Sequence, residues 1–126
     1  MVQTKGLDPY LGFFHTVQYG RPSLALDIEE EFRAVVVDAT VLDLLDAQAV
    51  APADFIQPPD KPGAVYADEG VRKRFVAAYE ARMNQRLLYG PTGTQETLRR
   101  CVLLQVEHLA RVLIAEEAAY QPFVWT

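Results

Sequence analysis

The sequence has a single cysteine, Cys101, among its 126 residues. One thiol cannot close an internal disulfide, which excludes a disulfide-stapled scaffold and fits a reducing cytoplasm. No apolar run reaches the ~18 residues that a membrane-spanning helix needs. The opening stretch, MVQTKG, also lacks the apolar core of a secretory signal. These absences favour a soluble, cytoplasmic protein.

Positive charge is also in deficit. The 12 Lys and Arg residues are outnumbered by 17 Asp and Glu, which gives a net charge of −5. A protein that coats nucleic acid shows an excess of Lys and Arg, so the totals speak against that class while leaving room for a local basic patch. Half of the residues are hydrophobic and 23% are charged. That composition indicates one globular domain with a single core.

The hydrophobic pattern predicts an all-α fold with about three main helices. The first is expected over about 22–47, and a proline-rich loop follows at 51–64. The second helix is expected over about 68–88 and the third over about 94–119. Because no long alternating pattern is present, the stretch GAVYA is at most a short extended piece.

The third predicted helix has one apolar stripe and is expected to be scaffold. Glu107 and Arg111 stand at i,i+4, the spacing of a modest surface ion pair. His108 lies off the stripe and is expected to be solvated. The stripe consists of Leu98, Val102, Val106, Leu109 and Leu113.

The first predicted helix differs because it has two apolar faces. Asp27 and Glu30 fall together between those faces at about 100° per residue. A helix with two apolar faces is enclosed by its neighbours, so the Asp27–Glu30 strip is expected to line a cleft. Carboxylates in a cleft must be paired, protonated or bound to a metal. One face consists of Leu24, Ile28, Phe32, Val35, Ala39 and Leu42, and the other of Leu26, Val37 and Leu44.

A histidine, His15, precedes that strip. Taken singly, each residue has an ordinary structural interpretation: His15 as a half-buried, hydrogen-bonded side chain, the two acids as a solvated helix edge, and Arg21 as a surface residue. Imidazole with carboxylate is nonetheless sensible ligand chemistry for Mg²⁺ or Mn²⁺, and histidine favours manganese. Two protein ligands leave most of the coordination sphere to water or substrate oxygens, which suits phosphoryl transfer.

Three stretches together resemble the CRISPR-associated integrase Cas1, in its C-terminal helical domain. They are GLDPYLGFFHTVQYGRPSLALDIEEEFR, VYADEGVRKRFVAAYEARM and the tail YQPFVWT. The most specific part is LGF-H followed by GRPSLALD and EEFR. By this resemblance His15 and Glu30 bind a divalent metal, and Asp27 is the acidic companion that orients a ligand or a bound water. Arg21, next to the site, is the candidate phosphate contact.

The resemblance implies a metal-dependent DNA endonuclease and integrase of CRISPR adaptation, which inserts new spacers by phosphodiester strand transfer. The implied cofactor is Mg²⁺ or Mn²⁺, and the implied partners are DNA, a second copy in a homodimer, and Cas2. Family members also carry an N-terminal β-rich domain and an earlier helix that supplies a glutamate ligand. Residues 1–126 are expected to begin after both and to be a weak or inactive nuclease alone. Ala34 stands where relatives often have proline, so the helix is expected to continue.

Two other interpretations stay open: a catalytically inactive helical interaction module, and a structural remnant that does not fold alone. Arg82 and Arg86 continue the apolar side of the second helix. We expect their stems to cover the core and their heads to reach solvent, the alternative being contact with the acidic strip or DNA. The tail, with Phe123 and Trp125, is too apolar to stay in water and is expected to pack on this domain or on Cas2.

Overall fold

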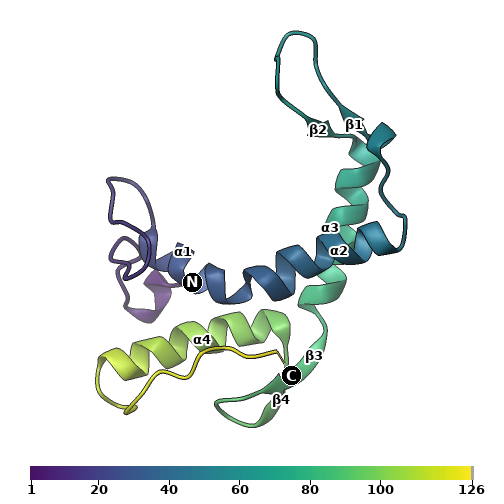
Figure 1. Cartoon of the computed structure of the whole chain (residues 1–126). Coiled ribbons are helices and arrows are strands. Elements are labelled where there is room, and N and C mark those ends of the chain that lie inside the picture. Colours follow the sequence, from purple (N-terminus) through teal and green to yellow (C-terminus); the bar gives the residue numbers. More distant parts are fainter. Residues whose placement is uncertain (126) are drawn as a thin grey trace.

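The structure, a computed structural model, describes residues 1–125 and is built mainly of helices. The α-helices are α1 (Ser23–Arg33), α2 (Ala39–Asp46), α3 (Glu69–Met83) and α4 (Leu98–Leu113). α1 and α2 follow one another along one line, α4 lies beside α1, and α3 crosses α2 (Figure 1). Among these helices none is both long and apolar enough to cross a membrane.

Two β-hairpins show that the all-α prediction is wrong. β1 (Phe55–Ile56) pairs antiparallel with β2 (Tyr66–Ala67), at the base of an arm that projects from the helices (Figure 1). β3 (Arg86–Tyr89) pairs antiparallel with β4 (Thr94–Thr97) and connects α3 to α4. The third helix therefore begins at Leu98, where Thr97 caps it, and not at 94.

The β3–β4 hairpin has a physical cause that the sequence hides. Leu87 and Tyr89 are 5% and 1% exposed, while the residues between and before them face outward. Alternation over only four residues is also compatible with the last turn of a helix, so periodicity alone cannot separate the two. A strand forms here because it buries Leu87 and Tyr89, and the Tyr89 hydroxyl donates a hydrogen bond to Gln105 of α4.

A π-helical stretch, Ala34–Asp38, joins α1 to α2. The helix expected over 22–47 is therefore continuous but not regular. A π turn takes in one more residue than an α turn. The buried face consequently moves from the expected Val35 and Ala39 to Val36 and Thr40, which are 6% and 1% exposed.

Arg82 of α3 holds the π-helical stretch in place. Its guanidinium donates to the Val35 carbonyl at 3.2 Å and also binds the carboxylate of Asp43. The Arg82 side chain is 13% exposed, so the expectation of a solvated head is wrong for this residue. Arg86 donates to the Gln95 carbonyl across the hairpin at 3.1 Å. Both arginines therefore bind backbone of this domain.

The tail returns along α4 and is tied to α1 (Figure 1). The Phe123 ring packs on Phe32, with ring centroids 4.5 Å apart. Glu31 accepts hydrogen bonds from the Phe123 N–H at 3.0 Å and from the Tyr120 hydroxyl. The prediction that the tail packs on this domain is confirmed for these residues. Trp125 is 40% exposed, and Thr126 lies outside the described residues.

Polar side chains of α4 lie buried under the tail. Gln105 Nε2 donates to the Tyr120 hydroxyl and to the Gln121 carbonyl, each at 2.8 Å. His108 Nε2 accepts a hydrogen bond from the Gln121 N–H at 2.8 Å. His108 is 2% exposed, so the expectation that it is solvated is wrong, because the tail covers the face on which it lies.

The ion pair expected on the surface of α4 is also replaced. Glu107 lies 2.7 Å from Lys5 near the N-terminus. Arg111 binds Glu117, just after the end of α4. Each charge that would have paired within the helix instead ties a neighbouring segment to it, which sequence spacing alone does not reveal.

Replacing Tyr120 with phenylalanine removes the hydroxyl that joins Gln105 to Glu31. Gln105 and Glu31 then each lose a hydrogen-bond partner. This loss should lower the free energy of unfolding by about 1–3 kcal/mol, measured by urea unfolding followed by circular dichroism. Tyr79→Phe is the matched control, because Tyr79 is half-buried against the core and no hydrogen bond of its hydroxyl is seen within residues 1–125. That control should change stability by less than about 0.5 kcal/mol. Equal losses in the two variants would show that the tail network is not stabilising.

Candidate metal centre

A buried carboxylate, Asp27, organises the loop that precedes α1. Its side chain has no exposed surface. Oδ2 accepts hydrogen bonds from the N–H of Phe13 at 2.6 Å and of Phe14 at 3.1 Å, and Oδ1 accepts one from the N–H of His15 at 2.8 Å. Successive backbone N–H groups that converge on one anion form a nest. Residues 13–15 therefore wrap around the Asp27 carboxylate.

Glycine is required where this loop touches α1. A Cβ atom at Gly12 would lie 2.6 Å from Asp27 Oδ2 and 2.7 Å from the Cβ of Ser23. Both distances are far below van der Waals contact, so a side chain there would push the loop off the carboxylate. Ser23, which is fully buried, donates to the Thr16 carbonyl at 3.1 Å and holds the other side of the loop.

The environment of Asp27 keeps it ionised. Burial alone would raise its pKa, but the hydrogen bonds from the N–H groups of Phe14, His15 and Phe13 and from the His15 ring outweigh burial and lower the pKa to about 2. Both oxygens are occupied by donors from this chain. Asp27 is therefore an anion that orients its neighbours rather than a free metal ligand.

The same carboxylate fixes the ring of His15. Nδ1 of His15 lies 2.8 Å from Asp27 Oδ1. An ionised carboxylate only accepts hydrogen bonds, so Nδ1 carries the proton and the lone pair of the neutral ring is on Nε2. The His15 side chain is 19% exposed. Metal-ligating histidines are held in this way by carboxylates, so Nε2 of His15 is suited to bind a cation.

Glu30 lies one turn beyond Asp27 on α1 and is exposed. Its Oε1 is 3.4 Å from Arg33 Nη1, and 41% of the Glu30 side chain is exposed. Such a long surface contact contributes little stability, so the carboxylate is available to another cation. Within residues 1–125 no hydrogen bond joins Glu30 to His15, and no group of three or more His, Cys, Asp or Glu is placed to hold a metal. A shared ion between His15 and Glu30 stays a prediction.

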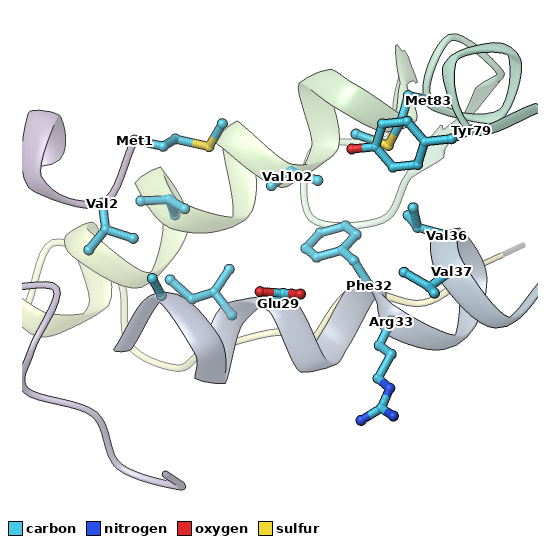
Figure 2. Close-up of a pocket in the computed structure, with 13 residues that line it drawn as sticks. Met1, Val2, Glu29, Phe32, Arg33, Val36, Val37, Tyr79, Met83 and Val102 are labelled. Carbon is cyan, nitrogen blue, oxygen red and sulfur yellow. The ribbon is translucent and has the colours of Figure 1, made fainter. Parts of the chain in front are cut away.

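The cleft expected beside the Asp27–Glu30 strip lies elsewhere. A groove of about 340 Å³ opens on another side of α1, between α1, α3 and α4 (Figure 2). Figure 2 shows Phe32 reaching into it from α1, with Glu29 in its wall and Arg33 extending away from it. The other lining side chains are almost all apolar, and include Val36, Met83 and Val106. Within the Asp27–Glu30 strip, the loop covers the carboxylate of Asp27, and the carboxylate of Glu30 is in solvent.

Arg21 stands at the end of the same loop. Its N–H donates to the Gln18 carbonyl at 3.1 Å, and its carbonyl accepts from the Ser23 N–H at 2.8 Å. No carboxylate of residues 1–125 pairs with its guanidinium. The backbone of Arg21 is thus fixed while its charged group stays free, which suits the phosphate contact expected from the sequence.

Sequence reasoning missed the two small residues that make the site possible, Gly12 and Ser23. Neither carries site chemistry, and both serve to let the loop approach α1. Only their positions in the sequence could have indicated this role: Gly12 stands directly before FFH, and Ser23 stands at the start of the first predicted helix. Backbone donors, which hold Asp27, leave no trace in a sequence.

The stability contributed by Asp27 should depend on pH. Its folded pKa, about 2, lies below the ordinary 3.8, so the stabilisation is present above about pH 4 and is lost as the pH falls through 2. We expect the difference in unfolding free energy between wild type and Asp27→Asn to shrink by about 2 kcal/mol from pH 6 to pH 2. Urea unfolding at several pH values measures it. A difference that does not change with pH would contradict the buried-anion description.

Comparison with known proteins identifies the family. Residues 1–81 match the family described as CRISPR associated protein Cas1. The CRISPR-associated endonuclease Cas1 3 of Thermus thermophilus is 41% identical over 118 residues, which covers 94% of this chain and 35% of that protein.

Solved structures share the fold. A casposase bound to integration product matches with a TM-score of 0.82 and 26% identity, over 95% of this chain and 34% of that one. A chain of a partial Cas6-RT-Cas1–Cas2 complex matches with a TM-score of 0.75 and 20% identity, over 96% and 35%. The chain thus spans about a third of the length of each of these proteins. On these matches, the chain belongs to the CRISPR-associated Cas1 family.

Proposed function

We propose that this chain forms the metal-binding part of a Cas1 active site that acts on DNA. The observation that carries the proposal is the 2.8 Å contact between His15 Nδ1 and Asp27 Oδ1. That contact sets the ring tautomer and leaves the Nε2 lone pair free. His108 differs, because its Nε2 accepts a hydrogen bond from the Gln121 N–H.

The available donors assign three different roles. Nε2 of His15 and the exposed carboxylate of Glu30 are the two metal ligands. Asp27 is a positioning residue, because its oxygens are already used and it acts through His15. One imidazole with one carboxylate fits Mn²⁺ or Mg²⁺, which keep water or substrate oxygens in their other coordination positions.

The proposed reaction is the insertion of short DNA in CRISPR adaptation. A DNA 3′-hydroxyl attacks a phosphodiester, a new P–O bond forms, and the P–O bond to the 3′ oxygen of the attacked strand breaks, so that this oxygen leaves as a hydroxyl. The Thermus thermophilus relative is named an endonuclease, and the matched casposase is described with an integration product. When bound, the divalent cation supplies Lewis-acid stabilisation of charge on the phosphate oxygens. The chain's own residues hold that ion through His15 and Glu30, and Arg21 contacts the phosphate.

The proposed partners are DNA, Cas2 and a second copy of the protein. The matched Cas6-RT-Cas1–Cas2 complex supports Cas2 as a partner, and the casposase structure supports DNA. The homodimer rests on the family resemblance alone. Trp125, which is 40% exposed at the end of the tail, is the element of this chain that we propose for contact with Cas2.

Removing either ligand should weaken Mn²⁺ binding. We expect His15→Ala and Glu30→Gln each to raise the dissociation constant by at least about tenfold, and Asp27→Asn by about 10- to 100-fold through loss of ring orientation. Isothermal titration calorimetry at neutral pH measures this. Glu29→Gln is the matched control, because Glu29 is the preceding acid on α1 but lines the apolar groove. If His15→Ala binds Mn²⁺ like wild type, the assignment is wrong.

Activity should need residues beyond this chain. Purified residues 1–126 should show little metal-dependent cleavage or strand transfer, because Mg²⁺ on two protein ligands exchanges readily and the net charge of −5 disfavours encounter with DNA. Joining the chain to the unmatched part of the Thermus thermophilus relative should give strand transfer that His15→Ala or Glu30→Ala removes.

The two halves of that experiment separate the alternatives. Robust cleavage by the chain alone, unaffected by these substitutions, would overturn the site. A chimaera that folds and stays inactive would favour the interaction module over the enzyme.

A further inference from the structure

We infer that protonation of His108 releases the C-terminal tail from the helices, so that the tail is a detachable, pH-sensitive segment. The inference concerns His108 and residues 120–125, which contribute no ligand to the proposed metal site, so it does not rest on the proposed function. The tail runs back along α4 (Figure 1) and carries Trp125. Its docked and released forms therefore present different surfaces to a partner.

The docked tail fits only the neutral form of His108. Nε2 of His108 accepts a hydrogen bond from the Gln121 N–H at 2.8 Å. Nε2 therefore carries the lone pair, and the proton of the neutral ring is on Nδ1. Nδ1 lies 2.5 Å from Glu117 Oε2, in contact but not aligned for a hydrogen bond.

A second proton on the ring would oppose the Gln121 N–H, because Nε2 is the one nitrogen that can take it. The ring has no room to turn aside, since it is 2% exposed and the Tyr120 ring is stacked on it, with ring centroids 5.1 Å apart. The Gln121 peptide is also fixed, because its carbonyl accepts a hydrogen bond from Gln105 Nε2. A charged His108 in the docked state leaves two buried donors facing each other, which is costly. Release of the tail removes this cost.

The charges beside His108 remain in place when the tail leaves. The Glu117 carboxylate favours the charged ring and the Arg111 guanidinium opposes it. Arg111 binds the Glu117 carboxylate, and the Glu117 N–H donates to the Arg111 carbonyl at 3.3 Å. Both residues therefore stay with α4 in either state. They affect the pH at which the ring becomes charged, whereas the Gln121 N–H makes that charge incompatible with docking.

The other titratable groups of the network come from α1, β3 and the tail itself. Burial and the Glu31 carboxylate, to which its hydroxyl donates, raise the pKa of Tyr120 above its usual range. Burial also raises the pKa of Tyr89, which donates to Gln105, to about 12. Both tyrosines are thus neutral at pH 8 and below. Histidine is the side chain that ordinarily changes charge between pH 5 and 8, so this range isolates His108 in the network.

The tail is bound by a short segment, so it can open without the helices. Besides the Gln121 peptide, the Phe123 ring packs on Phe32 of α1, and Glu31 accepts hydrogen bonds from Tyr120 and Phe123. Residues 120–125 form no helix or strand of their own. Segments with few buried contacts open locally at a lower free energy than global unfolding. We therefore expect acidification to open the tail while the helices stay folded.

The test uses the fluorescence of Trp125, the single tryptophan of the chain. Acrylamide, a neutral quencher, is titrated at several pH values from 8 to 5, while circular dichroism monitors the helices. Because release takes up one proton, the ratio of released to docked tail should rise by up to about tenfold for each pH unit. Quenching should increase as the pH falls, with no loss of the helical signal.

Four variants separate His108 from the other groups. His108→Gln should abolish the pH dependence, because glutamine offers an acceptor oxygen and takes up no proton. His15→Gln removes the other histidine and is the matched control, with the pH dependence of wild type. Glu31→Gln should increase quenching at every pH and keep the pH dependence. Glu117→Gln should move release to lower pH, because the carboxylate that favours the charged ring is gone.

NMR of the wild type tests the same coupling without any substitution. The His108 ring resonances and the hydrogen-exchange protection of the Gln121 amide are followed in one pH titration. We expect both to change over the same pH range, because the ring becomes charged only as its bond to Gln121 breaks.

Four outcomes would overturn the inference. Quenching of the wild type does not change between pH 8 and 5, His108→Gln keeps the full pH dependence, His15→Gln abolishes it, or the His108 ring titrates while the Gln121 amide stays protected.

Discussion

The hydrogen bonding of the Asp27 carboxylate is the interaction on which the proposed site depends. A buried charge is costly unless it is paired, and here three backbone N–H groups and the His15 ring offset that cost. The same contacts position residues 13–15 before α1 and set the tautomer of His15. Loss of this one carboxylate would therefore affect metal ligand and loop together.

α1 supplies three consecutive acids that have three different tasks. Glu29 faces the apolar groove (Figure 2), Glu30 stands in solvent beside Arg33, and Glu31 holds the tail through Tyr120 and Phe123. Successive helical residues point about 100° apart, so neighbours in sequence reach separate environments. The tail ties α1 to α4, and Arg82 ties the π-helical stretch to α3. Of the three acids, Glu30 has only its weak surface contact with Arg33.

Much of this arrangement could be predicted from the sequence, because long amphipathic helices and specific motifs are strong local signals. The continuous helix, the packing of Phe123 and the family follow in this way, and so does the neighbourhood of His15 and Asp27. The β3–β4 hairpin, the burial of His108 and the role of Arg82 could not be predicted. Each depends on a distant segment: Gln105 of α4 binds Tyr89, the tail covers His108, and the Val35 carbonyl binds Arg82. The π stretch shifts the buried face by one residue, which a regular period cannot show.

The chain has two histidines, which allow a direct test of whether the Nε2 of His15 is a metal ligand. His108 is the internal control, because it is buried and its Nε2 already accepts a hydrogen bond. The measurement is NMR of the two imidazole rings during titration with substoichiometric Mn²⁺, whose paramagnetism broadens nearby resonances. We expect the His15 resonances to broaden while those of His108 do not, and Glu30→Gln to reduce the broadening. Equal behaviour of the two rings, or no broadening of His15, would contradict the assignment of His15 as a ligand.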